Sequence, residues 1–70
     1  MVPNVYDVVP DRRTNGWRLE LRGGFGSRVF STRMEAVANG HERCTDERPA
    51  SLIVYGIDGR VQERRTYAKV

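Results

Sequence analysis

The sequence contains one histidine and one cysteine, His41 and Cys44, which stand three residues apart. This spacing places both side chains on one side of a helix, where they suit a Cys–His pair or half of a zinc site. Zinc takes three or four protein ligands, and a reactive thiolate needs exposure and an oriented base. Because the chain offers no further cysteine or histidine, we expect both residues to pack in the core or at its rim. The sequence therefore predicts no metal site.

A glycine-rich loop, RGGFGSR at residues 22–28, has the composition of loops that bind phosphate. A predicted strand separates it from the next helix, so it lacks the helix N-terminus that completes such sites. We interpret it as a hairpin loop, whose Phe25 either folds onto the core or contacts a partner. Glu20 and Glu63 are expected on exposed strand faces without a second acid in a pocket. We therefore expect no enzyme, no catalytic residue, no cofactor and no small-molecule substrate.

Of the 12 basic residues only Lys69 is not arginine, and the formal net charge is +3. Arginine binds phosphates and carboxylates through a planar fork of donors. An open sheet face with Arg18, Arg22 and Arg64 is a candidate surface for the phosphate backbone of a nucleic acid. The full set of candidate nucleic-acid-binding residues is Arg12, Arg13, Arg18, Arg22, Arg28 and Arg64. The alternative is that cross-strand pairs with acids such as Glu20 only solvate the sheet.

The first half of the chain is expected to supply three of the strands. Residues 5–9 are rich in β-formers and are bracketed by Pro3 and Pro10, which suits an edge strand. Asn15-Gly16 is a turn signal, and the alternation in residues 17–22 directs Trp17 and every second residue to the core. Residues 28–31 form a short third strand.

The second half is expected to supply one helix and two strands. Thr32 and Glu35 have the spacing of a capping box, which predicts a helix from Arg33 to Asp46. We predict that its buried stripe comprises Met34, Val37, His41 and Cys44. Gly40 indicates close approach of this helix to the sheet, and we expect that contact beneath Trp17. Residues 51–57 read as a continuous apolar strand at the centre of the sheet, and Asp58-Gly59 joins it to a partner strand over residues 60–68.

These elements predict an α+β fold in the order β-β-β-α-β-β, with one helix on one face of a twisted antiparallel sheet. A chain of 70 residues makes a single domain, residues 1–70. The single cysteine excludes an internal disulfide. The sequence shows no signal peptide and no apolar run that would span a bilayer. We therefore expect a cytoplasmic protein without a membrane partner.

Several short motifs resemble one known family. They are YDVVP at residues 6–10, GW at 16–17, FST at 30–32, EA at 35–36, DGRVQ at 58–62 and TY at 66–67. Over residues 5–67 the chain resembles the bacterial and phage family known as domain of unknown function 2188. The resemblance implies a small α+β domain with no assigned activity, and it transfers no catalytic or binding residue.

Two functional hypotheses follow. The first is a non-enzymatic interaction module, phage-encoded or a bacterial accessory protein, that binds another protein or itself through sheet edges. Its candidate partner-binding residues are Phe25, Val5 and Tyr6. Pairing of edge strands predicts a homodimer or another homo-oligomer. The alternative is a nucleic-acid-binding domain that uses the basic sheet face.

Overall fold

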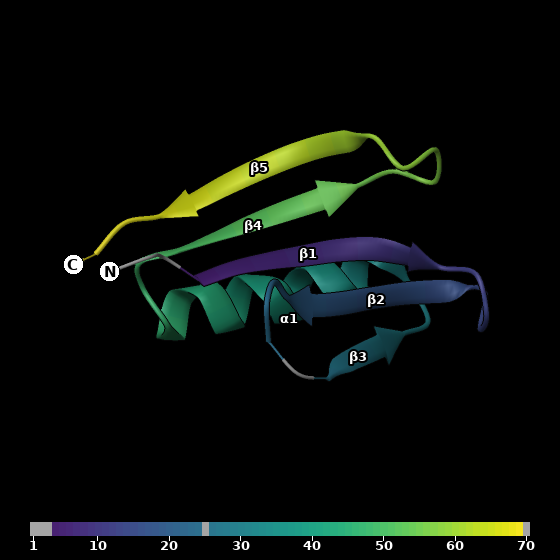
Figure 1. Cartoon of the computed structure of the whole chain (residues 1–70), viewed down its shortest axis with the longest axis horizontal. Helices are drawn as coiled ribbons and strands as arrows, with labels where there is room; N and C mark the ends of the chain where they lie inside the picture. Colours follow the sequence, from purple (N-terminus) through teal and green to yellow (C-terminus); the bar gives the residue numbers. More distant parts are fainter. Residues whose placement is uncertain (1–3, 25, 70) are drawn as a thin grey trace.

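A five-stranded sheet with one helix across one face makes up the described part of the chain, residues 4–24 and 26–69, in the computed structural model (Figure 1). The elements are β1 (Asn4–Asp11), β2 (Gly16–Leu21), β3 (Ser27–Phe30), α1 (Arg33–Asp46), β4 (Ala50–Tyr55) and β5 (Val61–Tyr67). The α+β class and the β-β-β-α-β-β order predicted from the sequence are confirmed.

The strands lie in the order β3-β2-β1-β4-β5, so β1 is the central strand and the expectation that it lies at an edge is wrong. The strand predicted at the centre, β4, lies between β1 and the edge strand β5. The pairs β1–β2, β2–β3 and β4–β5 are antiparallel, but β1 and β4 are parallel. The sheet is therefore mixed and not wholly antiparallel. The helix causes this, because it carries the chain back along the sheet before β4 begins. The β1–β4 ladder ends at Val8 opposite Val54, so Pro10 follows that ladder and does not interrupt it.

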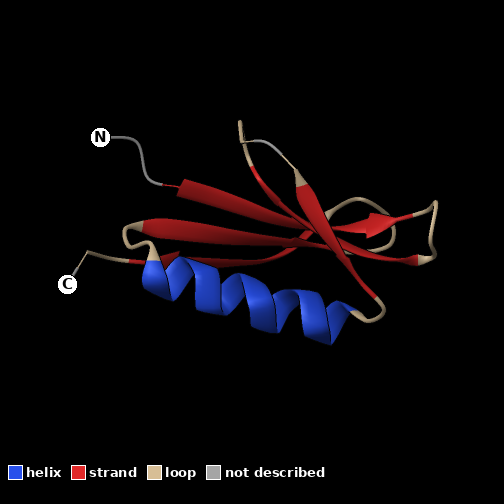
Figure 2. Cartoon of the chain, turned by 90° about the horizontal axis from the view of Figure 1, so that it is seen from below, coloured by secondary structure: helices blue, strands red, loops and turns tan. Residues whose placement is uncertain are grey.

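The core lies between α1 and one face of the sheet. Alternate residues of the three inner strands point to this face, among them Val8, Leu19 and Leu52. The largest fully buried side chains are Leu52, Val8, Val54 and Cys44. Trp17 and Phe30 pack against this cluster and are only partly buried. Figure 2 shows α1 along this face, whereas no helix of the described chain covers the opposite face, here called the open face.

Helix α1 begins and ends as predicted, and Thr32 is its N-cap, with Oγ1 accepting from the backbone N–H of Glu35 at 3.1 Å. Its buried residues are Ala36, Gly40 and Cys44, spaced by four positions. The predicted stripe was wrong at Met34, which is 81% exposed, and at His41, which is also exposed.

Small side chains replace the larger ones on the buried side because the helix lies very close to the sheet. A Cβ atom on Gly40 would stand 2.7 Å from Cδ1 of Leu52 and 3.2 Å from Cδ1 of Leu19. The close approach predicted at Gly40 is thus present, but the neighbours are Leu52 and Leu19 and not Trp17. A helix held this near has no space for a methionine in its buried stripe.

An irregularity in the β4–β5 ladder alters the direction of one side chain. Val54 faces Glu63 and Tyr55 faces Val61, so Gln62 is an extra residue between the two pairs. Simple alternation predicts Gln62 on the open face beside Arg64. The bulge instead turns Gln62 toward α1, where it meets Arg33.

Candidate functional site

The turns at one end of the sheet gather the described chain's most exposed apolar surface. We call this the loop end and define it as residues 12–15, 31–34 and 56–60, which follow β1, β3 and β4 (Figure 1). A cavity of about 450 Å³ opens here, lined by Trp17, Arg33, Gly56, Ile57, Asp58 and Gln62. A second cavity of about 260 Å³ is lined by Pro10, Asp11, Arg12, Asn15, Gly16, Trp17 and Ile57. Because Trp17 and Ile57 line both cavities, they form the centre of the loop end.

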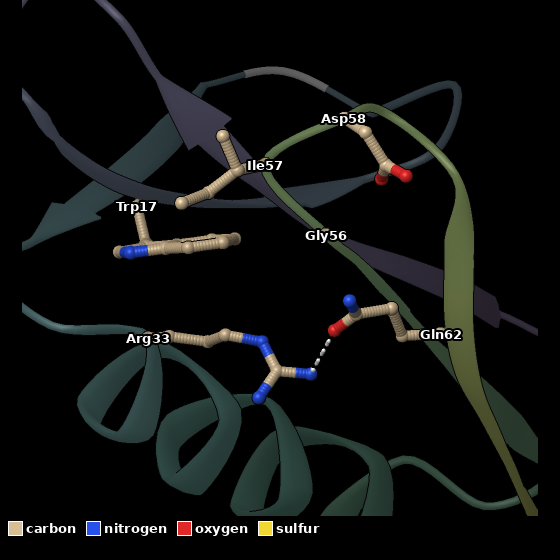
Figure 3. A pocket seen from close by; sticks show the side chains of 6 residues that line it. All are labelled: Trp17, Arg33, Gly56, Ile57, Asp58 and Gln62. Atoms are coloured by element: carbon tan, nitrogen blue, oxygen red, sulfur yellow. Dashed lines mark hydrogen bonds between the residues drawn. The ribbon is translucent and has the colours of Figure 1, made fainter.

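The Trp17 indole is held between two side chains from other elements. It projects from the start of β2, between Pro10 of β1 and Phe30 of β3 in the sheet register. The Arg33 guanidinium carbon lies 5.9 Å from the indole centroid on one side, a cation–π distance, and Ile57 lies on the other side (Figure 3). Each flat face of the indole therefore has one neighbouring side chain, and the ring forms one wall of the larger cavity.

Arg33 occupies an electrostatically unfavourable position, the first residue of α1. A cation there faces the positive end of the helix dipole, which costs about 0.3–1 kcal/mol. Its Nη2 donates to Oε1 of Gln62 at 3.0 Å (Figure 3), which the β5 bulge makes possible. Its Nε is buried and finds no acceptor among the described residues. Stacking on Trp17 and the bond to Gln62 hold this cation against the helix dipole.

The β4–β5 hairpin holds Ile57 outward. The backbone N–H of Gly56 donates to the carbonyl of Arg60 at 2.9 Å, and that of Gly59 donates to the carbonyl of Gly56 at 3.0 Å. Asp58 adds a side-chain acceptor for the backbone N–H of Arg60 at 3.1 Å, and Gly59 takes the left-handed conformation at φ 82°. The turn is thus closed by its own bonds, yet Ile57 is 76% exposed.

The β1–β2 turn is fastened by Asp11, which is only 5% exposed. Asp11 accepts from the hydroxyl of Thr14 and from Nη1 of Arg18, the latter at 3.0 Å. The bond from Thr14 and the charge of Arg18 hold the pKa of the Asp11 carboxyl below its usual value. Arg12 and Arg13 are exposed beside it and have no ion pair within the described chain. The turn therefore presents two free guanidinium groups next to the smaller cavity.

The open face does contain the predicted arginines, but carboxylates accompany them. Arg18 pairs with Asp11 and Glu20. Arg22 makes a bidentate pair with Asp7, at 2.7 and 3.1 Å, which together with the Asp7 charge raises the pKa of Arg22. By register, Arg64 lies on the same face, opposite Ile53. Three arginines thus share this face with three carboxylates, which removes the net positive charge that the nucleic-acid hypothesis assumed.

The other predicted residues do not join these arginines. Arg28 lies on the helix side of β3, with its guanidinium carbon 5.5 Å from the Phe30 centroid. Val5 is half-buried on the open face of the central strand. Tyr6 is 4% exposed and donates to Glu47 at 2.8 Å, and burial with this bond raises the pKa of Tyr6 to about 12. Tyr6 therefore offers almost no surface to a partner, and β1, which carries it, is not an edge strand. Phe25 lies outside the described residues.

His41 and Cys44 do not form a pair. Cys44 is buried against β4, where its thiol donates to the carbonyl of Ser51 at 3.6 Å, and burial raises the pKa of Cys44 to about 11. The Nδ1 of His41 lies 2.8 Å from the hydroxyl of Tyr67 instead. The described residues contain no group of three possible metal ligands. None of their helices is both long and apolar enough to cross a membrane.

The prediction from sequence missed Arg33, Ile57 and Gln62 as members of one site. Ile57 carried a local signal, since an aliphatic residue directly before Asp58-Gly59 stands in an exposed turn. No local sequence signal marked Arg33 or Gln62, because these two side chains meet only through the bulge in β5.

A comparison with models of protein families identified the family of this chain. The model of the family described as "Uncharacterized protein conserved in bacteria (DUF2188)" matches residues 6–67. The searches of curated proteins and of solved structures found no match. The family match spans nearly all of the 70 residues and agrees with the resemblance carried by the short motifs. The chain therefore belongs to the DUF2188 family.

Proposed function

We propose that this protein is a non-catalytic module that binds another protein at the loop end, where the partner inserts an apolar side chain into the cavity beside Trp17 and Ile57. The observation that carries the proposal is the 450 Å³ cavity next to an isoleucine that is 76% exposed on a closed turn. Interfaces concentrate their binding energy in a few well-packed residues, with tryptophan and arginine enriched among them. Trp17, Ile57 and Arg33 supply such a centre.

The geometry of Trp17 favours a protein over a nucleic acid. A single-stranded nucleic acid binds by stacking its bases on open aromatic faces. Arg33 lies over one face of this indole and Ile57 lies beside the other, so neither face is an open platform for a base (Figure 3). The ion pairs of Arg18 and Arg22 also weaken the case for phosphate binding on the open face.

Self-association through sheet edges is the weaker form of the interaction hypothesis. The edge strands are β3, with four residues, and β5, with seven. The middle of β5 reads Glu63-Arg64-Arg65, and charged residues on an edge strand oppose pairing with another chain. A homodimer, a phage or bacterial accessory role and a cytoplasmic location remain predictions.

A peptide selection tests the proposal. A random linear peptide library displayed on phage is selected on the protein, and tryptophan-free peptides are synthesised from the enriched sequences. Trp17 is the one tryptophan of the chain, so its fluorescence reports occupancy of the adjacent cavity without a label. Charging an anchor residue costs about 2 kcal/mol or more, so we expect Ile57→Asp to weaken binding at least about tenfold.

The matched control is Val29→Asp, because Val29 is also an exposed aliphatic residue but lines neither of the two cavities. We expect it to leave the affinity unchanged. Thermal unfolding of both variants, followed by circular dichroism, shows that the fold is intact. Equal affinity of the Ile57→Asp protein and the parent for every selected peptide would refute binding at the loop end.

A further inference from the structure

We infer that the segment bound at the loop end is acidic: its apolar side chain fills the larger cavity beside Trp17 and Ile57, and its carboxylates pair with Arg12, Arg13 and Arg33 on either side. This inference rests on the proposed function and adds the chemistry of the partner to it.

The arginines at the loop end differ from those within the sheet. In the sheet, Arg18, Arg22 and Arg65 have carboxylate partners at 3.0 Å or less. At the loop end no carboxylate of the described chain lies within ion-pair distance of Arg12, Arg13 or Arg33. Solvation of a sheet by cross-strand pairs therefore does not explain these three side chains.

The carboxylates near the loop end, Asp11, Glu35 and Asp58, each have a partner within the chain, and Glu35 accepts from the hydroxyl of Thr32 at 3.1 Å. The carboxylate of Asp11 accepts hydrogen bonds from Thr14 and Arg18. Asp58 accepts from the backbone of its own turn and makes only a 3.8 Å contact with Arg60, whose side chain is 88% exposed. Within the loop end, Arg12, Arg13, Arg33 and Arg60 stand against one carboxylate, Asp58, which lines the larger cavity. This excess of positive charge favours an anionic partner.

The two groups of free arginines lie beside different cavities. Arg33 lines the larger cavity and Arg12 lines the smaller one, and Trp17 with Ile57 stands between the two. An extended segment that crosses this centre therefore has guanidinium groups near the residues on both sides of its apolar anchor. Carboxylate side chains flanking an apolar residue match this arrangement.

Arg33 adds a reason specific to a carboxylate. Its guanidinium stands at the N-terminus of α1, where an anion is favoured and a cation is not. A bound carboxylate beside Arg33 gains from the guanidinium and from the helix dipole together, and it offsets the unfavourable placement of Arg33.

Charge variants test the inference separately from the proposed function. Arg12→Glu with Arg13→Glu reverses two charges at the loop end. The matched control is Arg28→Glu with Arg64→Glu, which makes the same charge change on β3 and β5, again at arginines without an ion pair in the described chain. The probes are the selected peptides, the same peptides with Asp and Glu replaced by Asn and Gln, and a single-stranded oligonucleotide.

We expect the selected peptides to combine an apolar residue with nearby Asp or Glu, and their affinity to fall as salt rises. The loop-end double variant should weaken binding about tenfold or more, and the control double variant less than twofold. Neutralised peptides should bind about equally to the parent and to the loop-end variant. Thermal unfolding of both double variants excludes loss of fold as the cause.

Two results would overturn the inference and are distinguishable. If binding depends on Ile57 but neither salt nor the loop-end charges change it, the acidic partner is wrong and the proposed function stands. If the oligonucleotide competes with the peptides and its binding depends on Arg12 and Arg13, a nucleic acid is the ligand. The acidic partner and the proposed function are then both wrong.

Discussion

At the scale of single residues, the carboxylate of Asp11 joins the open face to the loop end. It accepts from Thr14 in the β1–β2 turn and from Arg18 on β2, and these contacts hold its pKa below the usual value near 3.8. A carboxyl whose pKa is lower in the folded state stabilises the fold above its unfolded pKa, and this contribution is lost as the pH falls through the folded pKa.

We therefore expect the stability of the protein to decrease as the pH falls below about 4, with Asp11 as one of the responsible groups. In the Asp11→Asn variant the stability should be lower at neutral pH and should depend less on pH in the acidic range. Urea denaturation at a series of pH values measures both effects. Parallel pH profiles for the variant and the parent would show that Asp11 does not contribute.

Trp17 contributes to stability as well as to the cavity. It is only partly buried, so Trp17→Ala should cost about 3 kcal/mol, near the lower end of the range for tryptophan in a core. Ile57→Ala is the control, since removal of an exposed side chain changes stability by about 0.5 kcal/mol or less. Urea denaturation followed by circular dichroism compares them. Equal midpoints for the two variants would mean that Trp17 does not support the core.

At the scale of elements, the contact between α1 and the sheet is set by Gly40. Alanine at this position improves helix propensity by about 1 kcal/mol but overpacks a filled core, which costs about 1–3 kcal/mol. The added Cβ would meet Leu52, which is fully buried and has little room to move.

We expect Gly40→Ala to destabilise the protein by about 1 kcal/mol net. Thr45→Ala is the matched control, because it raises helix propensity at an exposed position of the same helix. Thermal unfolding should place the Gly40 variant below the parent and the Thr45 variant near it. A Gly40→Ala protein more stable than the parent would contradict the close packing of α1 on β4.

The elements themselves were predictable because their signals are local. Thr32 and Glu35 marked the start of α1, and the alternation around Trp17 gave the correct face of β2. The neighbours of β1 were not predictable, since β4 begins 39 residues after β1 ends and their pairing depends on the path of the helix between them. The buried side of α1 was also misjudged, because hydrophobic periodicity favours Met34 over the small residues that close packing requires.

At the scale of the whole molecule, the net charge of +3 is not evidence for a basic sheet face. Arg18 and Arg22 bridge to carboxylates on neighbouring strands, whereas Arg64 has no such partner in the described chain. We expect Arg18→Ala and Arg22→Ala to lower the unfolding midpoint and Arg64→Ala to leave it unchanged. Thermal unfolding of the three single variants tests this.

The same variants address nucleic-acid binding. If the open face has no net charge, the parent protein should show little salt-sensitive affinity for duplex DNA at low ionic strength. Fluorescence anisotropy with a labelled duplex measures that affinity. Tight binding that is lost in the Arg18 and Arg22 variants, but not in the loop-end double variant, would restore the open face as the functional surface.

The candidate site was only partly predictable at this scale. Asn15-Gly16 and Asp58-Gly59 marked two of its turns, and Trp17 was recognised as a core residue. The two turns and Trp17 lie at the same end of the sheet because of the strand order, which local sequence signals do not specify. The cavity also depends on the bulge that turns Gln62 toward Arg33, and no sequence pattern in β5 predicted this bulge.

The central position of β1 has a consequence for synthesis on the ribosome. Strand β2 follows β1 after a short turn, but β4 ends only at Tyr55. The end of β4 follows the end of β1 by 44 residues. At a translation rate of about 5–20 residues per second, the ribosome needs about 2 to 9 seconds to synthesise them. Throughout that interval one side of the future central strand has no neighbour. A nascent chain stalled within α1 should therefore be digested readily by protease, and one that has released β5 should resist.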